Sequence, residues 1–197
     1  MSRLVVASLV AVILAVAPAA WADDGGDSAA DKDKNPSMAG TLFAEAGVVF
    51  NLLHIPESTA DGGFGFRLAA GFQFTDKVRA HFAFRTLSNE NKDMGGTKED
   101  YSDLSLGLGL SLDGKYFNIE GELTLPTISG TGFSEGGFGG GVYFVAGYPL
   151  SPNFKVIGRV GAYAASVDVP SNGGRRIPMW GLVGFGVVYQ GAPWAGR

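Results

Sequence analysis

The chain has 197 residues, with 15 Lys and Arg against 19 Asp and Glu, which gives a formal net charge of −4 at pH 7. This mildly acidic balance offers no attraction to phosphates, so no nucleic-acid partner is expected. The chain contains no cysteine, which excludes disulfides, thiol catalysis and lipid attachment through a cysteine.

The first 22 residues have the pattern of a secretory signal peptide. Arg3 supplies a positive start, residues 4–17 form an apolar core, and Ala20-Trp21-Ala22 offers small residues around a cleavage site. Cleavage is therefore expected after Ala22. Residues 23–40 are acidic and lack apolar periodicity, so we expect a flexible acidic periplasmic lead, with a short partner-binding tail as the alternative.

A two-residue rhythm then runs through the rest of the chain. It is clearest in residues 101–112, where every second residue from Leu104 to Leu112 is leucine, the residues between them are Ser or Gly, and Asp103 precedes the first leucine. Such alternation predicts a strand, and a transmembrane strand needs ~9–11 residues against ~5–6 in soluble proteins. The rhythm recurs in segments 42–52, 64–74, 78–85, 101–112, 117–125, 138–148, 154–164 and 182–189. We predict eight strands in one domain, residues 41–190, followed by a C-terminal tail, residues 191–197.

The connections between these segments alternate in length. Tight turns are predicted at residues 75–77, 113–114 and 149–153, and longer polar loops at residues 55–63, 89–100, 129–137 and 170–176. Bacterial outer-membrane barrels have short periplasmic turns and longer extracellular loops. The strand count places both ends of the domain on the short-turn side.

The two faces of the strands predict which side meets lipid. The polar face carries glycines, four acids, four arginines and one histidine: Glu45, Arg67, Arg79, His81, Arg85, Asp103, Glu120, Glu122 and Arg159. A crowded eight-stranded interior requires small residues, whereas a solvated face does not. The apolar face carries aromatic residues toward both strand ends, as membrane interfaces favour. We therefore expect the apolar face outward, and a soluble lipocalin-like barrel with its apolar face inward is the alternative.

This pattern resembles the small eight-stranded bacterial outer-membrane proteins of the OmpA transmembrane domain and OmpX type. The resemblance covers about residues 41–190 and rests on topology and patterning. It implies an all-β, antiparallel, up-and-down transmembrane barrel in the outer membrane of a Gram-negative bacterium, monomeric and in contact with lipids and lipopolysaccharide. Val183, Phe185, Val187 and Tyr189 resemble the closing strand that the barrel assembly machinery recognises, although this chain continues beyond the aromatic residue.

The charged residues of the polar face are expected to pair and plug the lumen, because a barrel of this size is filled by its own side chains. The predicted role is structural or surface-interacting, without enzymatic activity, cofactor or metal. Two further alternatives remain: a narrow solute or ion channel, and a lipid A-modifying enzyme using His54 with Glu57, Ser58, Ser88 or Asp100.

Overall fold

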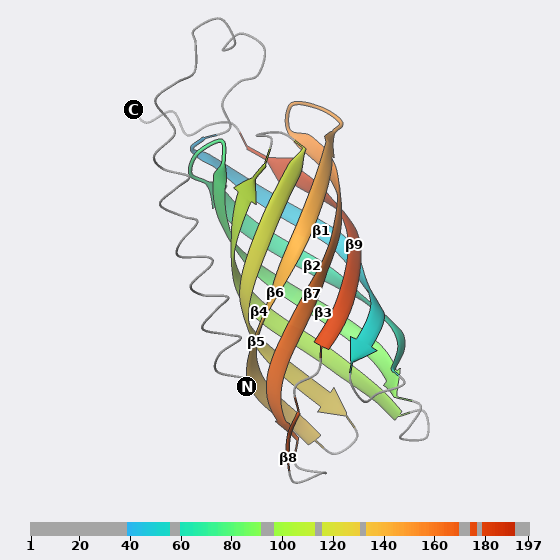
Figure 1. The fold of residues 1–197 in the computed structure, drawn as a ribbon. Helices are drawn as coiled ribbons and strands as arrows, with labels where there is room; N and C mark the ends of the chain where they lie inside the picture. Colours follow the sequence, from blue (N-terminus) through green and yellow to red (C-terminus); the bar gives the residue numbers. More distant parts are fainter. Residues whose placement is uncertain are drawn as a thin grey trace, which may run out of the picture.

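The computed structural model describes residues 39–55, 60–91, 97–112, 116–130, 133–169, 174–176 and 179–191. Within these ranges the regular structure consists of nine β-strands (Figure 1). They are β1 (Thr41–Ile55), β2 (Ala60–Gln73), β3 (Val78–Asn91), β4 (Thr97–Ser111), β5 (Phe117–Gly130), β6 (Phe133–Pro149), β7 (Phe154–Val169), β8 (Gly174–Arg176) and β9 (Met179–Gln190). No helix in the described part of the chain is long and apolar enough to cross a membrane.

Eight of the strands form a closed barrel. From β1 to β7 each strand pairs antiparallel with the next, and β9 then pairs with both β7 and β1. The short strand β8 pairs with β7 alone. Figure 1 shows the strands inclined to the long axis of the barrel, as closure of a sheet requires. The predicted eight-stranded, up-and-down antiparallel barrel is confirmed.

The apolar residues of each strand face outward. Leu104 and Leu106 are 62% and 50% exposed, whereas Asp103 and Ser105 beside them are 2% and 4% exposed. Exposed aromatic residues gather at one end of the strands, as the sequence predicts: Phe74, Phe117, Tyr148, Phe154 and Tyr189. At the other end the prediction is met only in part, because Phe64 lies toward that end but Phe66, Phe84 and Phe185 are exposed in the middle of their strands. The soluble alternative with an apolar interior face is therefore wrong.

Val78 departs from this outward pattern. The sequence places it on the apolar outer face, yet it is buried. The turn before β3 folds back at this point, because the Phe74 amide donates to the Val78 carbonyl oxygen at 2.9 Å and the Val78 amide donates to Thr75 Oγ1 at 3.1 Å. Val78 is therefore the first residue of β3 and is held by the turn that precedes the strand.

We call the end of the barrel at which the chain passes from β1 to β2 the loop end. The opposite end, which has the connections β2–β3, β4–β5 and β6–β7, is the turn end. At the loop end the strands extend further than the sequence predicts. Most of the predicted loop 89–100 is strand, because β3 continues to Asn91 and β4 begins at Thr97. Only residues 131 and 132 separate β5 from β6, so the predicted loop 129–137 is a hairpin tip. These polar extensions were missed because backbone pairing continues where apolar alternation stops.

The pairing between β5 and β6 has one interruption. It runs from Phe117↔Ala146 to Thr124↔Gly139 and resumes at Thr127↔Gly136, so Leu125 and Pro126 are skipped. Proline has no backbone N–H to contribute to a ladder. Pro126 still pairs in register with Asp103 of β4, so the strand stays in the wall.

Several predictions concern residues outside the described ranges. The signal peptide 1–22, most of the lead 23–40 and most of the tail 191–197 lie there, and so do Glu57 and Ser58. Gly40 ends the lead in a turn with φ of 75°, a conformation that suits glycine, and its amide donates to the Gln73 carbonyl oxygen at 2.7 Å. The Gly191 amide donates to the Leu42 carbonyl oxygen, so β1 begins and β9 ends side by side at the turn end.

Candidate functional site

The structure gathers all nine charged residues of the polar face inside the barrel. Glu45 comes from β1, Arg67 from β2, Arg79, His81 and Arg85 from β3, Asp103 from β4, Glu120 and Glu122 from β5, and Arg159 from β7. All are buried apart from Arg79, whose side chain is 12% exposed. We call these nine residues the lumen network. They extend from Arg79 at the turn end of β3 to Arg85 and Asp103 in the middle of β3 and β4.

Glu45 connects the first strand to two others. Its Oε1 accepts a hydrogen bond from Arg67 Nη1 at 2.9 Å, and both its oxygens accept from Arg159 Nη2, at 2.8 and 2.9 Å. Charge-assisted bonds of this kind are roughly twice as strong as neutral ones. One carboxylate thus holds β1, β2 and β7 together from the inside.

Glu122 is the centre of the lumen network. Arg67 donates to it, His81 Nε2 lies 3.1 Å from its Oε1, and Arg159 Nη1 lies 3.8 Å from the same oxygen. Glu120, two residues earlier on the same face of β5, pairs with Arg79 and lies 3.4 Å from Arg159 Nη1. Glu120 and Glu122, both on β5, therefore pair with arginines from β2, β3 and β7.

Asp103 and Arg85 form the part of the lumen network nearest the loop end. Asp103 Oδ2 accepts hydrogen bonds from Arg85 Nε and Nη2 at 2.8 and 2.6 Å, and from the Tyr101 hydroxyl at 2.7 Å. Arg85 Nη1 donates to the Tyr143 hydroxyl at 2.5 Å. The guanidinium of Arg85 also lies over the ring of Tyr163, 4.8 Å from its centroid. These hydrogen-bond partners and aromatic faces offset part of the cost of burying the pair. Within the described part of the chain, Asp103 Oδ1 is buried without a hydrogen-bond partner.

Three aromatic rings close the lumen above Arg85, toward the loop end. Tyr163 stacks on Trp180 with ring centroids 5.2 Å apart, and Tyr101 lies 5.1 Å from Trp180 and 5.7 Å from Tyr163. Thr124 Oγ1 and the Tyr163 hydroxyl lie within hydrogen-bond distance, 2.7 Å. We call Tyr101, Tyr163 and Trp180 the aromatic layer. The sequence placed Tyr163 on the polar face, but the contribution of Trp180 was missed because strand β9 was expected to start at residue 182.

At the turn end the lumen network is covered less completely. Phe43, Val145, Ile157 and Val188 are buried there, and the Phe43 ring lies 5.3 Å from the guanidinium carbon of Arg79. A cavity of about 30 Å³ opens beside them, lined by Arg79 and by polar side chains of neighbouring strands. This volume suits one or two water molecules. The lumen network is thus approached by solvent from the turn end.

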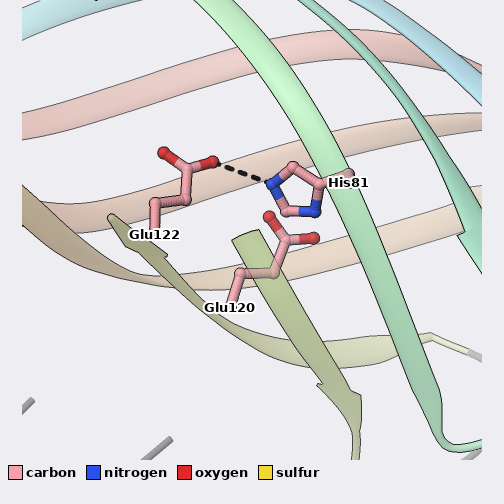
Figure 2. Close-up of side chains that lie close together, drawn as sticks. All are labelled: His81, Glu120 and Glu122. Atoms are coloured by element: carbon pink, nitrogen blue, oxygen red, sulfur yellow. Dashed lines mark hydrogen bonds and ion pairs between the residues drawn. The ribbon is translucent and has the colours of Figure 1, made fainter. Parts of the chain in front are cut away.

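Three residues of the network have the chemistry of metal ligands. His81, Glu120 and Glu122 place one ligand atom each within 4.8 Å of one another, and Figure 2 shows the histidine of β3 facing both glutamates of β5. The same carboxylates already bind guanidinium groups. A cation would have to displace these arginines and leave them unpaired in a buried site, at a cost of several kcal/mol each. The cluster is better described as part of an ion-pair network than as a metal centre.

The inward glycines make room for the larger side chains opposite. A Cβ atom on Gly107 of β4 would overlap the ring of His81, its partner in the pairing of β3 with β4. A Cβ atom on Gly71 would lie 2.6 and 2.7 Å from two ring carbons of Phe43. Both glycines therefore belong to the packing of the lumen, which explains their position on the polar face.

Of the residues proposed for a lipid A-modifying enzyme, Ser88 of β3 and Asp100 of β4 are in register, whereas His54 lies on β1. Phe50 of β1 is in register with Phe64 of β2, and Phe64 with Ser88 of β3, so Ser88 lies two strands away from Phe50. The backbone of His54 lies a further four residues along β1, ~13 Å at ~3.3 Å per residue. His54 and Ser88 are therefore too far apart for a direct hydrogen bond. The side chains of His54, Glu57 and Ser58 lie outside the described part.

The residues expected to form the assembly signal lie on the outer face of β9. Phe185, Val187 and Tyr189 are all exposed, and Val183 lies on the same side of the strand. Tyr189 packs against Phe154 of β7 with ring centroids 5.2 Å apart. The strand continues only one residue further, to Gln190.

No family model and no curated protein matches this chain. Among solved structures, the crystal structure of Neisserial surface protein A (NspA) superposes with a TM-score of 0.57 at 16% identity, covering 75% of this chain and 96% of that one. The chain has the fold of a small outer-membrane β-barrel. OprG from Pseudomonas aeruginosa (TM-score 0.48, 14% identity, 78% of this chain and 96% of that one) and Ail of Yersinia pestis (0.44, 16%, 78% and 99%) are also similar. The closed eight-stranded ring and its similarity to NspA confirm, at the level of fold, the resemblance to small outer-membrane barrels.

Proposed function

We propose that the chain is an integral β-barrel of the Gram-negative outer membrane with a structural or surface-interaction role. Its outer wall supports this location, because leucine, valine and phenylalanine side chains are exposed along every strand of the ring. Water would not favour such a wall, whereas a lipid bilayer requires it. The turn end is then periplasmic and the loop end extracellular, following the usual orientation of such barrels.

The observation that carries the proposed role is the filling of the lumen. The lumen network has members on six of the eight ring strands. Ion pairs link β1, β2, β3, β5 and β7, and the pair of Arg85 with Asp103 adds β4. The aromatic layer covers it on the extracellular side. A barrel filled in this way is a rigid support for its extracellular hairpins rather than a passage for solutes.

The test is conductance of the purified protein in planar lipid bilayers. A plugged barrel gives no discrete steps at moderate voltage, while the folded state is verified by heat-modifiable migration on gels. Recovery of the protein from the outer-membrane fraction checks the location independently. A soluble periplasmic product would contradict the location, and regular conductance steps would contradict the plug.

A narrow ion path is the second candidate, and the periplasmic cavity favours it. Arg79 lines this cavity and is the most exposed member of the lumen network. If Glu120 changed partner from Arg79 to Arg159, the released Arg79 guanidinium would be in contact with the solvent of the cavity. The aromatic layer would still have to move before ions could cross. Conductance that appears only when the aromatic layer is removed would assign the barrier to that layer.

The remaining partners follow from the membrane location. Lipids and lipopolysaccharide would surround the wall, the barrel assembly machinery would recognise Val183, Phe185, Val187 and Tyr189, and the barrel would act as a monomer. No cofactor and no catalytic activity are proposed. Unchanged lipid A in a deletion strain would support the non-enzymatic role, and altered acylation would overturn it.

A further inference from the structure

One part of the outer wall carries a groove. It encloses about 680 Å³ and crosses strands β2, β3, β4 and β5, reaching β6. Its lining is almost entirely apolar, and it includes Leu68, Phe84, Leu104 and Leu125 on one side and Phe82 and Leu106 on the other. We call it the wall groove.

The register of the strands explains the shape of the wall groove. One side of the groove is a row of consecutive partners across four strands: Leu68, Phe84, Leu104 and Leu125. The other side is the next outward row: Ala70, Phe82, Leu106 and Leu123. The floor is the row between them, Ala69, Ala83, Ser105 and Thr124, whose side chains point inward and are buried. The groove therefore runs between two rows of large side chains on β3, β4 and β5, and its β2 end is lower on the side of Ala70.

The described outward positions of β1, β7 and β9 do not repeat this arrangement. On β1, β7 and β9 the outward rows are interrupted by small residues, among them Ala44, Ala46, Gly158, Ala162 and Gly181. A row with such gaps has no continuous side. The depth of the wall groove comes from the leucine and phenylalanine side chains that fill both outward rows on β3, β4 and β5.

We propose that the wall groove binds one acyl chain of a membrane lipid, which lies across β2 to β5. This inference rests on the proposed membrane location, in which the outer wall of β2 to β5 is surrounded by the hydrocarbon core of the bilayer. The lining side chains are almost entirely apolar, so a hydrocarbon chain in the groove would contact them at ordinary van der Waals distances. A void left in the groove would forfeit these contacts along its whole length.

A second copy of the barrel is a weaker occupant than an acyl chain. In a bilayer, apolar surfaces gain no hydrophobic free energy by meeting each other, because lipid tails are equally apolar. Association then depends on close packing or on hydrogen bonds across the contact. The groove lining offers bulky Leu and Phe side chains and no exposed polar group except the backbone of its floor, whose Ser105 and Thr124 hydroxyls face the lumen.

The test uses the full protein in phosphatidylcholine vesicles that contain a small fraction of phosphatidylcholine with a diazirine in the middle of one acyl chain. After illumination, labelled peptides are mapped by mass spectrometry. We expect several-fold more label on the groove residues of β2 to β5 than on the outward residues of β7, β9 and β1. Equal labelling around the wall would overturn the acyl-chain site while leaving the membrane location intact. Absence of label from the whole wall would instead overturn the location.

Two variants sharpen the result. Ala70→Phe fills one end of the groove and should reduce labelling there several-fold, whereas Ala162→Phe, the same change at another exposed outward position on β7, should leave groove labelling unchanged. Should Ala70→Phe fail to give the folded, heat-modifiable form, Ala70→Leu replaces it.

Because the chain has no cysteine, a single Leu106→Cys variant also tests whether a second copy of the barrel occupies the groove. Disulfide-linked dimers on oxidation in vesicles would favour a second copy and contradict the proposal.

Discussion

Glu45 and Arg159 are far apart in the sequence, yet both oxygens of the carboxylate accept hydrogen bonds from one guanidinium nitrogen of Arg159, at 2.8 and 2.9 Å. The bond passes inside β9, which lies between β1 and β7 in the wall. It therefore braces the region where the first and last strands of the ring meet. Backbone pairing of β1 with β9 closes the barrel, and this ion pair fixes the closure from within.

Removing the carboxylate of Glu45 should be strongly destabilising. Glu45→Gln leaves Arg67 and Arg159 with reduced compensation in a buried site, for which about 3–5 kcal/mol is expected. The free energy of unfolding from urea titrations in lipid vesicles measures this. Asp100→Asn, an exposed carboxylate near the loop end of β4, is the matched control and should change stability by less than about 0.5 kcal/mol. Equal effects from the two substitutions would contradict the importance of the lumen network.

The pair Arg85 and Asp103 should show strong non-additivity. Asp103→Leu alone strands a buried guanidinium, and Arg85→Met alone strands a buried carboxylate, so each should destabilise the fold. The double variant removes both charges and should cost less than the sum of the two single variants by about 0.5–3 kcal/mol. A double-mutant cycle on unfolding free energies measures the coupling. An additive result would mean that Tyr101 and Tyr143, not the ion pair, satisfy these groups.

Gly107 should tolerate no side chain while His81 is present. Gly107→Ala forces a methyl group into the imidazole ring and should destabilise the barrel by roughly 1–3 kcal/mol. His81→Ala in the same chain should recover part of that loss, because it removes the obstructing ring. The control is Gly136→Ala, where the nearest atom to the added methyl group is the Pro126 carbonyl oxygen at 3.9 Å. Its unfolding free energy should match that of the unsubstituted protein.

The leucines of β4 should report their depth in the bilayer. Leu106→Arg places a charge in the middle of the outer wall and should cost about 2–4 kcal/mol, whereas Leu112→Arg, at the turn end, should cost about 0–1 kcal/mol. Both leucines are exposed to similar extents, 50% and 57%, so accessibility does not distinguish them. Unfolding titrations in vesicles give the two values. Equal costs would indicate that the wall is not surrounded by lipid.

The aromatic layer should control passage through the lumen. Replacing both Tyr163 and Trp180 by alanine removes the stacked pair above Arg85 and opens the extracellular half of the lumen. We expect discrete current steps in planar bilayers for this double variant and silence for the unsubstituted protein. Phe185→Ala, an aromatic residue on the outer wall, should stay silent. Silence from both variants would place the barrier in the lumen network itself.

Much of the fold follows from alternation alone, because the side-chain period of a strand equals the period of the sequence pattern. The leucines of β4 thus identify the lipid-facing side, and Asp103 between them the lumen. The same rule fails at the loop end. Residues 89–91 and 97–100 are polar on both faces, so nothing in their sequence indicates pairing, yet their backbones continue the ladder of β3 and β4.

The lumen was only partly accessible to sequence reasoning. Alternation assigns Glu120, Glu122 and Arg159 to one face, but it does not show which acid meets which base, because that depends on the stagger of strands around the ring. The proximity of His81 to both glutamates comes from this stagger. Trp180 gave no usable signal, since Pro178 and Gly181 on either side of it obscure the start of β9.

The packing of Gly107 against His81 also constrains how the barrel can change over evolutionary time. The space inside is shared, so a larger residue at position 107 is acceptable only when position 81 becomes smaller. Among homologues, the two positions should therefore vary together, with their volumes changing in opposite directions. Gly71 differs, because an added Cβ atom would also meet the Ala80 carbonyl oxygen at 2.2 Å, so no change at Phe43 makes room for it. At positions 81 and 107 the shared inner volume, rather than either side chain, is the quantity that selection preserves.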